Sequence, residues 1–297
     1  MTATEAPPTN VIAPERSVAG HLSDVWTYRE LLVNLVRKEL KVKYKNSVLG
    51  FLWSLLNPIS QVIVFTVVFQ IVLKNTIPFF PIFLLSGMLA WNLFALSLAG
   101  ATGSITGNHH LVNKVYFPRE ILPLAAVGAN CVHFVLQSSV LLATIAVTGV
   151  GFDWRWVWLV VPALLVLLVL ASALAIALSA VNVYARDTQH LLDVVLMAWM
   201  WVTPLIYQWR LPAEKLAEKD LPSWLVLLNP VVSITVALQR ALYQQHYVGD
   251  PKQPMLPVEG QWWYLRNLGI VGAFSVLAFI LAMRLFHRLE GNFAEEL

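Results

Sequence analysis

Six long apolar stretches dominate the pattern of hydrophobic and polar positions along the chain. They cover approximately residues 50–73, 79–101, 121–148, 156–181, 191–209 and 264–286. A hydrocarbon core about 30 Å thick requires roughly 20 predominantly apolar residues per helix, so each stretch is long enough to cross a bilayer. The sequence therefore predicts an all-α membrane protein with six transmembrane helices.

Basic residues mark one side of this predicted bundle. An even number of spans leaves both ends of the chain on the same side, and most Lys and Arg residues near the spans fall there: Arg29, Arg37, Lys38, Lys41, Lys43, Lys45, Lys114, Arg119, Arg186, Arg284 and Arg288. The short connections opposite contain Lys74 and Arg155. Because short cytoplasmic loops carry an excess of Lys and Arg, we expect both termini to be cytoplasmic.

The connection between the fifth and sixth spans is unusually apolar. Its segment LPSWLVLLNPVVSITVALQRAL (221–242) is broken by Asn229 and Pro230. We expect two re-entrant half-helices in the outer leaflet here, an arrangement that a membrane tolerates where the backbone packs on protein or lines a cavity. A seventh span is the alternative, but it would place Arg284 and Arg288 outside, against the charge pattern.

A basic, amphipathic segment precedes the first span without a linker. Its apolar residues recur at three- and four-residue spacing: Tyr28, Leu31, Leu32, Leu35, Val36 and Leu40. The basic residues Arg37, Lys38 and Lys41 lie largely elsewhere around the helix. This pattern predicts an interfacial helix over residues 24–46 along the cytoplasmic membrane surface, with a basic face that can bind anionic lipid or a partner protein.

The predicted interfacial helix has a defined start and a tight exit. Thr27 and Glu30 have the spacing of a capping box, and the Pro/Thr/Ala-rich residues 1–23 are typical of a disordered cytoplasmic tail. The exit passes through a short turn that contains Leu49 and Gly50. A flat helix joined so closely to an upright one would act as a bent lever in a pump driven from the cytoplasm. A simple topology anchor is the alternative.

Polar residues interrupt the first and third spans at helical spacing. The first span has Ser54, Asn57 and Gln61 on one stripe around Pro58, and the third has Asn130, His133 and Gln137. Polar side chains at such depth usually face another helix or a water-filled path, and hydrogen bonding between packed helices is the alternative to a path. His133 has no second His, Cys or carboxylate at ligand spacing, so we expect no metal site.

Tryptophan is unusually frequent in this chain. Several residues flank predicted spans, where an aromatic belt is the ordinary explanation: Trp154, Trp156, Trp158, Trp262 and Trp263. Trp199 and Trp201 lie inside the fifth span instead, near Tyr207. Flat aromatic faces can stack on sugar rings, and close packing of helices is the alternative use.

Composition agrees with a membrane protein and excludes several other classes. The chain is 58% hydrophobic and 12% charged, with a mean hydropathy of +0.66, whereas soluble domains carry about 25% charged residues. A net charge of +3 is too small to indicate nucleic-acid binding. The single cysteine, Cys131, lies in an apolar run, so no intrachain disulfide can form.

No source of energy is visible in the sequence. It has no G-x-x-x-x-G-K-[ST] phosphate-binding loop, and no span has a mid-membrane Asp, Glu, Lys or Arg of the kind that ion-coupled carriers use. A pump built on this chain would therefore take its energy from another subunit, and we expect this chain to bind no cofactor.

Three segments resemble one family of membrane proteins: RELLVNLVRKELKVKYKNSVLGFLWSLLNPI, NKVYFPREILPLA and VYARDTQH. They are similar to the permease subunit of bacterial ABC exporters for lipid-linked polysaccharides, of the O-antigen and teichoic-acid type, from about residue 24 to the last span. The resemblance implies a homodimer of six-span permeases in the bacterial plasma membrane. Two copies of a separate nucleotide-binding subunit would hold ATP and Mg²⁺, and the permease itself would have no catalytic residues.

The resemblance also implies roles for individual positions. Contact with the ATPase subunits would involve Arg37, Lys38, Lys41, Lys114, Tyr116, Arg119 and Glu120. Leu49 and Gly50 would form a cytoplasmic gate near the lipid pyrophosphate. The channel at the dimer interface would be lined by Trp53, Asn57, Gln61, Trp199, Trp201 and Tyr207, and the outer gate would contain Trp224, Asn229 and Pro230. For the loop over residues 108–123, a charged loop that merely faces water is the alternative.

These interpretations divide the chain into a disordered tail (1–23), an interfacial helix (24–46), a permease domain (47–290) and a cytoplasmic tail (291–297). The substrate would be a polyprenyl-pyrophosphate-linked polysaccharide. The Ala-, Val-, Leu- and Trp-rich composition resembles high-GC actinobacterial proteins and favours a cell-wall galactan.

Two other functions remain open from the sequence. An ABC exporter permease for small drugs or lipids is the alternative within transport. A membrane glycosyl- or phosphotransferase would need clustered acidic residues at the bilayer edge, whereas Asp153, Asp187 and Asp193 are isolated.

Overall fold

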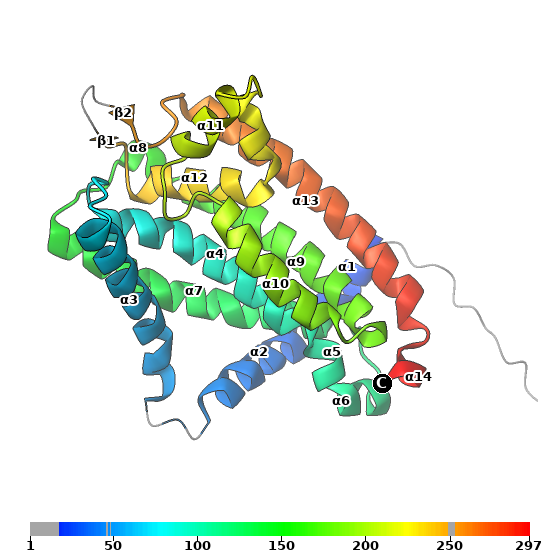
Figure 1. Cartoon of the computed structure of the whole chain (residues 1–297). Helices are drawn as coiled ribbons and strands as arrows, with labels where there is room; N and C mark the ends of the chain where they lie inside the picture. Colours follow the sequence, from blue (N-terminus) through cyan, green and yellow to red (C-terminus); the bar gives the residue numbers. More distant parts are fainter. Residues whose placement is uncertain (1–17, 46, 48, 249–252) are drawn as a thin grey trace, which may run out of the picture.

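Helices form most of the structure (Figure 1). The computed structural model describes residues 18–45, 47, 49–248 and 253–297. Within these residues the strands are limited to an antiparallel pair, β1 (Tyr247–Val248) and β2 (Gln253–Pro254). The predicted all-α class is therefore confirmed.

In the described part of the chain, five helical segments are long and apolar enough to cross a membrane. They are α3 (Trp53–Thr66) continued by η2 (Val67–Val72), α4 (Phe80–Thr102), α7 (Ile121–Thr148), α8 (Trp154–Val157) with α9 (Val160–Tyr184), and α13 (Gln261–Glu290). The other helices are α1 (Val18–Thr27), α2 (Arg29–Tyr44), η1 (Gly50–Leu52), α5 (Ser104–Gly107), α6 (His109–Lys114), α10 (Thr188–Val202), α11 (Arg210–Ala217), η3 (Ser223–Leu228), α12 (Pro230–Leu242) and α14 (Phe293–Glu296).

The fifth predicted span is shorter than expected. The sequence predicts it over residues 191–209, but α10 ends at Val202 and is about 22 Å long at 1.5 Å per residue. It ends there because Thr203 precedes Pro204, and a proline ring pushes the preceding residue out of the α conformation. Thr203 accordingly has φ −93° and ψ 127°. The count of six spans stays a prediction.

The apolar segment after α10 is broken where the sequence predicts a break. η3 ends at Leu228 and α12 begins at Pro230, and the Asn229 side chain accepts a hydrogen bond from the Val231 amide at 3.1 Å. Proline is favourable here because the first N–H of a helix has no helical partner. With 13 residues, α12 is too short for a seventh span, and it packs against α4 and α9. Its insertion into the outer leaflet stays a prediction.

The bundle has two ends, each with its own group of buried side chains. At the first, named the proximal end, α2, α5, α6 and α14 meet the adjoining ends of α7, α9 and α13 around Leu35, Ile121 and Phe293 (Figure 1). At the other, named the distal end, α8 and α12 meet the opposite ends of the long helices around Tyr243 and Tyr264. The described N-terminal helices and the C-terminus therefore lie at the same end.

Burial differs sharply among the long helices. In the most apolar 18-residue window of α4, 78% of the residues are buried, whereas the share in the first span, α3 with η2, is 6%. α4 packs along α7, α9 and α12, so it forms the centre of the bundle. α3 and α10 leave apolar side chains such as Ile63 and Val194 exposed in the single chain.

The N-terminal helices differ in detail from the prediction. Helical structure begins at Val18, inside the predicted tail, and residues 1–17 of that tail lie outside the described residues, as does position 46 at the end of the predicted interfacial helix. The predicted capping box is wrong. The Thr27 hydroxyl donates to the Ser23 carbonyl at 2.9 Å within α1, and no side chain caps α2.

α2 packs closely on α7. Leu35 is buried among side chains of the proximal end, and Leu31 and Val36 pack beside it. A Cβ atom on Gly128 of α7 would lie 2.9 Å from Val36 Cγ2, well inside the separation at which carbon atoms attract. Gly128 therefore provides the space into which α2 packs, and protein covers part of the predicted apolar stripe.

We expect Gly128→Ala to destabilise the protein. In a helix this change normally stabilises by about 0.5–1 kcal/mol, but overpacking here should cost about 1–3 kcal/mol and displace α2. The thermal unfolding midpoint of the purified protein in detergent should fall, and an added Val36→Ala should restore it. Gly269→Ala in α13 is the matched control, because a Cβ there meets no atom within 4 Å, and its midpoint should rise. A rise in Gly128→Ala as well would contradict the close packing.

Candidate functional site

The link between α2 and α3 turns at a glycine. Gly50 has φ +47°, a left-handed conformation that a side chain would strain by about 1–2 kcal/mol. Its amide donates to the Ser47 hydroxyl at 3.1 Å, and Leu49 is 42% exposed. Position 48 lies outside the described residues. The two predicted gate residues thus form a tight, exposed turn, and their role as a gate stays a prediction.

The polar stripe of the first span lies at the edge of the packed surface of α3. Ser54 is buried, and its hydroxyl is 3.1 Å from His133 Nδ1 on α7. Asn57 and Trp53 are exposed, and Gln61 is half-buried. Hydrogen bonding between helices, one of the two uses predicted for such residues, is therefore confirmed for Ser54 and His133. Asn57 lies on the open face of α3, where an amide turned toward lipid would be costly.

The aromatic residues of the fifth span have different environments. The Trp199 ring packs edge-on against Phe94 of α4, with 5.2 Å between the ring centroids, and its Nε1 donates to Asn229 Oδ1 at 2.9 Å. Trp199 thus packs inside the chain. Trp201 is 53% exposed, and the Tyr207 hydroxyl donates to the Trp201 carbonyl at 2.8 Å. Of the three predicted channel residues here, Trp201 is the one most open to a second chain or a substrate.

Asn229 connects α10 to α12. Its Nδ2 donates to the Thr203 hydroxyl at 2.9 Å, while its Oδ1 accepts from Trp199 Nε1 and from the Val231 amide. One amide side chain thus provides hydrogen-bond partners for groups at the end of α10 and at the start of α12. The sequence predicts only a break here, although Asn before a first-turn proline is also a typical helix cap. Trp224, another predicted outer-gate residue, is 57% exposed.

Part of the predicted ATPase contact surface is exposed at the proximal end. The exposed positions include Arg37, Lys41, Lys114 and Tyr116. Tyr116, in the loop between α6 and α7, is 93% exposed, and exposed tyrosines often become anchors of protein interfaces. Lys38 Nζ donates to Asn108 Oδ1 at 2.5 Å, which joins α2 to the start of α6. Contact with an ATPase stays a prediction for all of these residues.

Arg119 and Glu120 face the C-terminal segment. Arg119 Nη1 donates to the Glu290 carbonyl at 2.8 Å, and the guanidinium carbon lies 5.9 Å from the centre of the Phe293 ring. Glu120 is 1% exposed, and Phe293 of α14 is fully buried. The predicted tail 291–297 is thus packed in part against the bundle. Any role of Arg119 and Glu120 in contact with the ATPase subunit would therefore be indirect, through the position of the C-terminal segment that they hold.

The pKa of the Glu120 carboxyl is raised in the folded protein. Burial raises its pKa, and the nearby carboxylate of Glu290 raises it further. A backbone hydrogen bond and His287 act in the opposite direction without reversing the shift. The folded state therefore holds this proton more tightly than the unfolded chain does.

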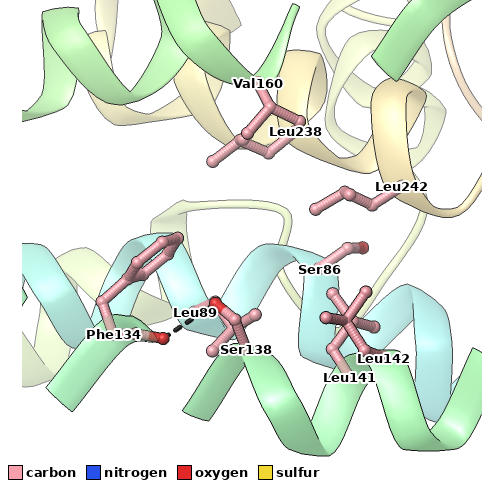
Figure 2. Close-up of a pocket in the computed structure, with 9 residues that line it drawn as sticks. All are labelled: Ser86, Leu89, Phe134, Ser138, Leu141, Leu142, Val160, Leu238 and Leu242. Carbon is pink, nitrogen blue, oxygen red and sulfur yellow. Dashed lines mark hydrogen bonds between the residues drawn. The ribbon is translucent and has the colours of Figure 1, made fainter. Parts of the chain in front are cut away.

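Two pockets in the described part of the chain are almost entirely apolar. The first, of about 150 Å³, is lined by Ser86, Leu89, Phe134, Ser138, Leu141, Leu142, Val160, Leu238 and Leu242 (Figure 2). The second, of about 330 Å³, is lined by Leu165, Leu168, Val169, Ser172, Val276 and Phe279. In the first, the Ser86 and Ser138 hydroxyls donate to carbonyls of their own helices. Neither lining suits a sugar chain, which needs many hydrogen-bonding partners.

The family of the chain follows from comparison with known proteins. The ABC-2 type transporter family matches residues 30–243, and the chain belongs to it. The match begins in α2 and continues through α12, so it includes the amphipathic helix, the glycine turn and the Asn229 connection. The resemblance drawn from the three sequence segments is confirmed.

Three relatives show what kinds of protein are similar. The O-antigen export system permease protein RfbA of Myxococcus xanthus is 32% identical over 274 residues, which cover 92% of this chain and 98% of the relative. The protein of the same name from Klebsiella pneumoniae is 28% identical over 266 residues, 90% and 94% of the two chains. The polysialic acid transport protein KpsM of Escherichia coli is 26% identical over 98 residues, 32% and 36% of the two chains. The first two similarities extend over nearly the whole chain.

We expect Glu120→Gln to remove a pH-dependent loss of stability. Because the folded state raises the pKa of Glu120, the free energy of unfolding falls as pH rises from the ordinary value of 4.5 through the raised value. The variant should therefore gain thermal stability relative to the native protein as pH increases from about 4.5 through the raised pKa of Glu120, measured by unfolding in detergent. Glu295→Gln, at an exposed position of α14, is the control. A constant difference between Glu120→Gln and the native protein at every pH would contradict the burial effect.

Proposed function

We propose that the chain is the membrane permease of an ATP-driven exporter for a polyprenyl-pyrophosphate-linked polysaccharide. Two copies would form the channel between them, along α3 and α10, and two copies of a separate ATPase subunit would bind at the proximal end. The nearly full-length similarity to two O-antigen export permeases supports the substrate class. A cell-wall galactan is the particular substrate that the composition favours.

One observation carries the proposal: the first span is apolar enough for a membrane, yet 6% of its most apolar window is buried within the chain. The same span exposes Asn57 and Trp53. An amide that faces lipid is unfavourable, whereas a second copy of the chain or a polar substrate would offer hydrogen bonds. Trp53 and Trp201 would supply flat faces on which sugar rings can stack. The apolar pockets of the single chain also favour a path between two chains.

The path of the chain supports six crossings. Successive helices α3, α4, α7, α9, α10 and α13 run alternately between the proximal and distal ends. α10 would be the fifth crossing in spite of its 15 residues, because a short span can be accommodated where the bilayer thins or another chain covers its end. Basic residues gather at the proximal end, which would make both termini cytoplasmic in a bacterial plasma membrane.

The proximal end offers the surface for a subunit that hydrolyses ATP. Exposed Tyr116 and Lys114 lie at this end together with the basic face of α2. Since the chain has no phosphate-binding loop, ATP and Mg²⁺ would be held by the partner. α2 would take up the movement of the ATPase, and α3 would respond across the Gly50 turn. The lipid pyrophosphate would enter near Leu49 and Gly50.

Depletion of the protein in its native bacterium should trap the lipid-linked polymer on the cytoplasmic side. Without a permease, a charged and hydrated glycan has no path through the hydrocarbon core. The measurement is the fraction of lipid-linked glycan that an external glycosidase can digest in intact cells, which should fall to background and recover when the native gene is returned. Normal export after complete loss would contradict the proposal. Loss of resistance to small drugs with unchanged glycan export would favour the alternative permease class.

We expect Tyr116→Ala to weaken binding of the ATPase subunit. Removing a central aromatic anchor typically raises the Kd by about tenfold or more, which can be measured by titrating the labelled ATPase subunit onto the permease in nanodiscs. Tyr247→Ala is the matched control, because Tyr247 is 53% exposed and lies in β1, at the distal end. Equal affinity of the Tyr116→Ala variant and the native protein would place the contact elsewhere.

A further inference from the structure

A cluster of polar side chains joins the end of α2 and the start of α3 to α7. His133 of α7 lies within hydrogen-bonding distance of three side chains, with Lys43 Nζ 3.3 Å from its Nε2 and the hydroxyls of Tyr44 and Ser54 each 3.1 Å from its Nδ1. The Tyr44 and Ser54 hydroxyls also hydrogen-bond to each other. We name these four residues the His133 cluster.

The donors and acceptors of the cluster fit a neutral imidazole. An ammonium group can only donate, so His133 Nε2 accepts from Lys43, which assigns the ring proton to Nδ1. That proton is donated to an oxygen of Tyr44 or Ser54, and a hydroxyl proton makes the bond between those two side chains. Both ring nitrogens are thereby used, as expected of a side chain that is 4% exposed.

The cluster is one of the few places where α3 is buried against its own chain. Within α3 the buried residues are Ser54 and Pro58, and the rest of the helix is largely open. Tyr44 is the last residue of α2, so the cluster joins the adjoining ends of the two helices. His133 belongs to α7, which packs along the central helix α4. The imidazole is therefore where the end of α2 and the base of the weakly buried α3 meet the firmly packed part of the bundle.

A separate contact sets the direction of α2. Val36 fits against Gly128 of α7, and Lys43 and Tyr44 contact His133 further along the same pair of helices. Two contacts at different points along α2 define how its axis lies on α7. A tilt of α2 that moves Val36 away from Gly128 would therefore also shift Tyr44 relative to His133.

We infer that His133 is a positioning residue for transport, which keeps the end of α2 and the start of α3 moving as one unit. The inference rests on the proposed function, because that function gives α2 its displacement by an ATPase and gives α3 its place in the channel wall. The bonds among Tyr44, Ser54 and His133 carry the displacement to the base of α3. Without them, the turn at Gly50 absorbs the movement. His133 contacts no substrate in this role.

The first test compares ATP hydrolysis with export in the complete exporter, reconstituted in vesicles with its ATPase subunit and a lipid-linked glycan. His133→Phe and Tyr44→Phe should keep ATP hydrolysis, while glycan exported per ATP falls by about tenfold, the size of effect expected when a buried hydrogen bond is lost and its partner is left unsatisfied. His133→Gln should recover much of the loss, because its amide can accept from Lys43 and donate to a hydroxyl. The double variant His133→Phe with Tyr44→Phe should be no worse than either single variant, since both break the same contact.

Ser138→Ala is the matched control for these variants. Ser138 also lies on α7, but its hydroxyl donates to the Phe134 carbonyl of the same helix at 2.8 Å. Its removal should leave export per ATP unchanged. If His133→Phe does not fold, Tyr44→Phe still provides the test, because it removes a single oxygen atom.

A second measurement requires no substrate. Val42 and Ile63 are 62% and 58% exposed, so spin labels can be attached to cysteines placed there after the native Cys131 is replaced by Ala. The distance distribution between the labels reports how firmly α3 is held to α2. It should be narrow in the otherwise native protein and in Ser138→Ala, and broad in His133→Phe and Tyr44→Phe.

The outcomes separate the inference from the proposed function. Unchanged export per ATP and unchanged distance distributions in both Phe variants would overturn the role of His133. Failure of the native exporter to move the glycan would overturn the proposed function alone, and a broad distribution in the Phe variants would then still support the connection between α2 and α3.

Discussion

A polar group within a membrane helix has no water to bind, so protein or substrate must supply its partner. This constraint divides α3 into two parts. Ser54 turns toward His133 and is satisfied inside the chain, whereas Asn57 lies on the open face of the helix. The base of α3 is thereby attached to the bundle. Val62, Phe65 and Phe69 pack against the core further along the same span, while the face that exposes Ile63 and Val64 is available to a second chain. A helix held on one face and open on the other is suited to line a path between two chains.

A polar contact also holds α10, at the distal end of the bundle. Asn229 bonds both Trp199 and Thr203, so the end of α10 and the start of α12 share one amide. Between α3 and α10, the centre of the bundle is close-packed, with 78% of the α4 window buried, and close-packed interiors resist deformation. Movement would therefore concentrate in the two weakly buried helices. Ser54 and Asn229 supply the polar contacts that help to attach those helices to the bundle.

The proximal surface shows why charge in a loop is weak evidence for a docking role. Arg119 bonds the Glu290 carbonyl and lies beside the Phe293 ring, and Glu120 is buried beneath the same corner. These residues hold the C-terminal segment against the start of α7. The neighbouring Tyr116 is left almost completely exposed, so the surface proposed for the ATPase subunit is aromatic and basic. Arg119 and Glu120 help to set its shape by holding the C-terminal segment in place.

Helix formation, apolar length and amphipathic spacing are local properties, and for that reason the sequence alone determined the all-α membrane class, the long spans and the break before α12. The early end of α10 was also readable, because a residue before proline leaves the helical conformation. The partners of the polar residues were not readable: Ser54 and His133 are 79 positions apart, and Arg119 and Glu290 are 171 apart. Contacts at such separation exist only after the helices have packed. Tertiary packing therefore decided which polar groups are satisfied within the chain and which remain exposed for another molecule.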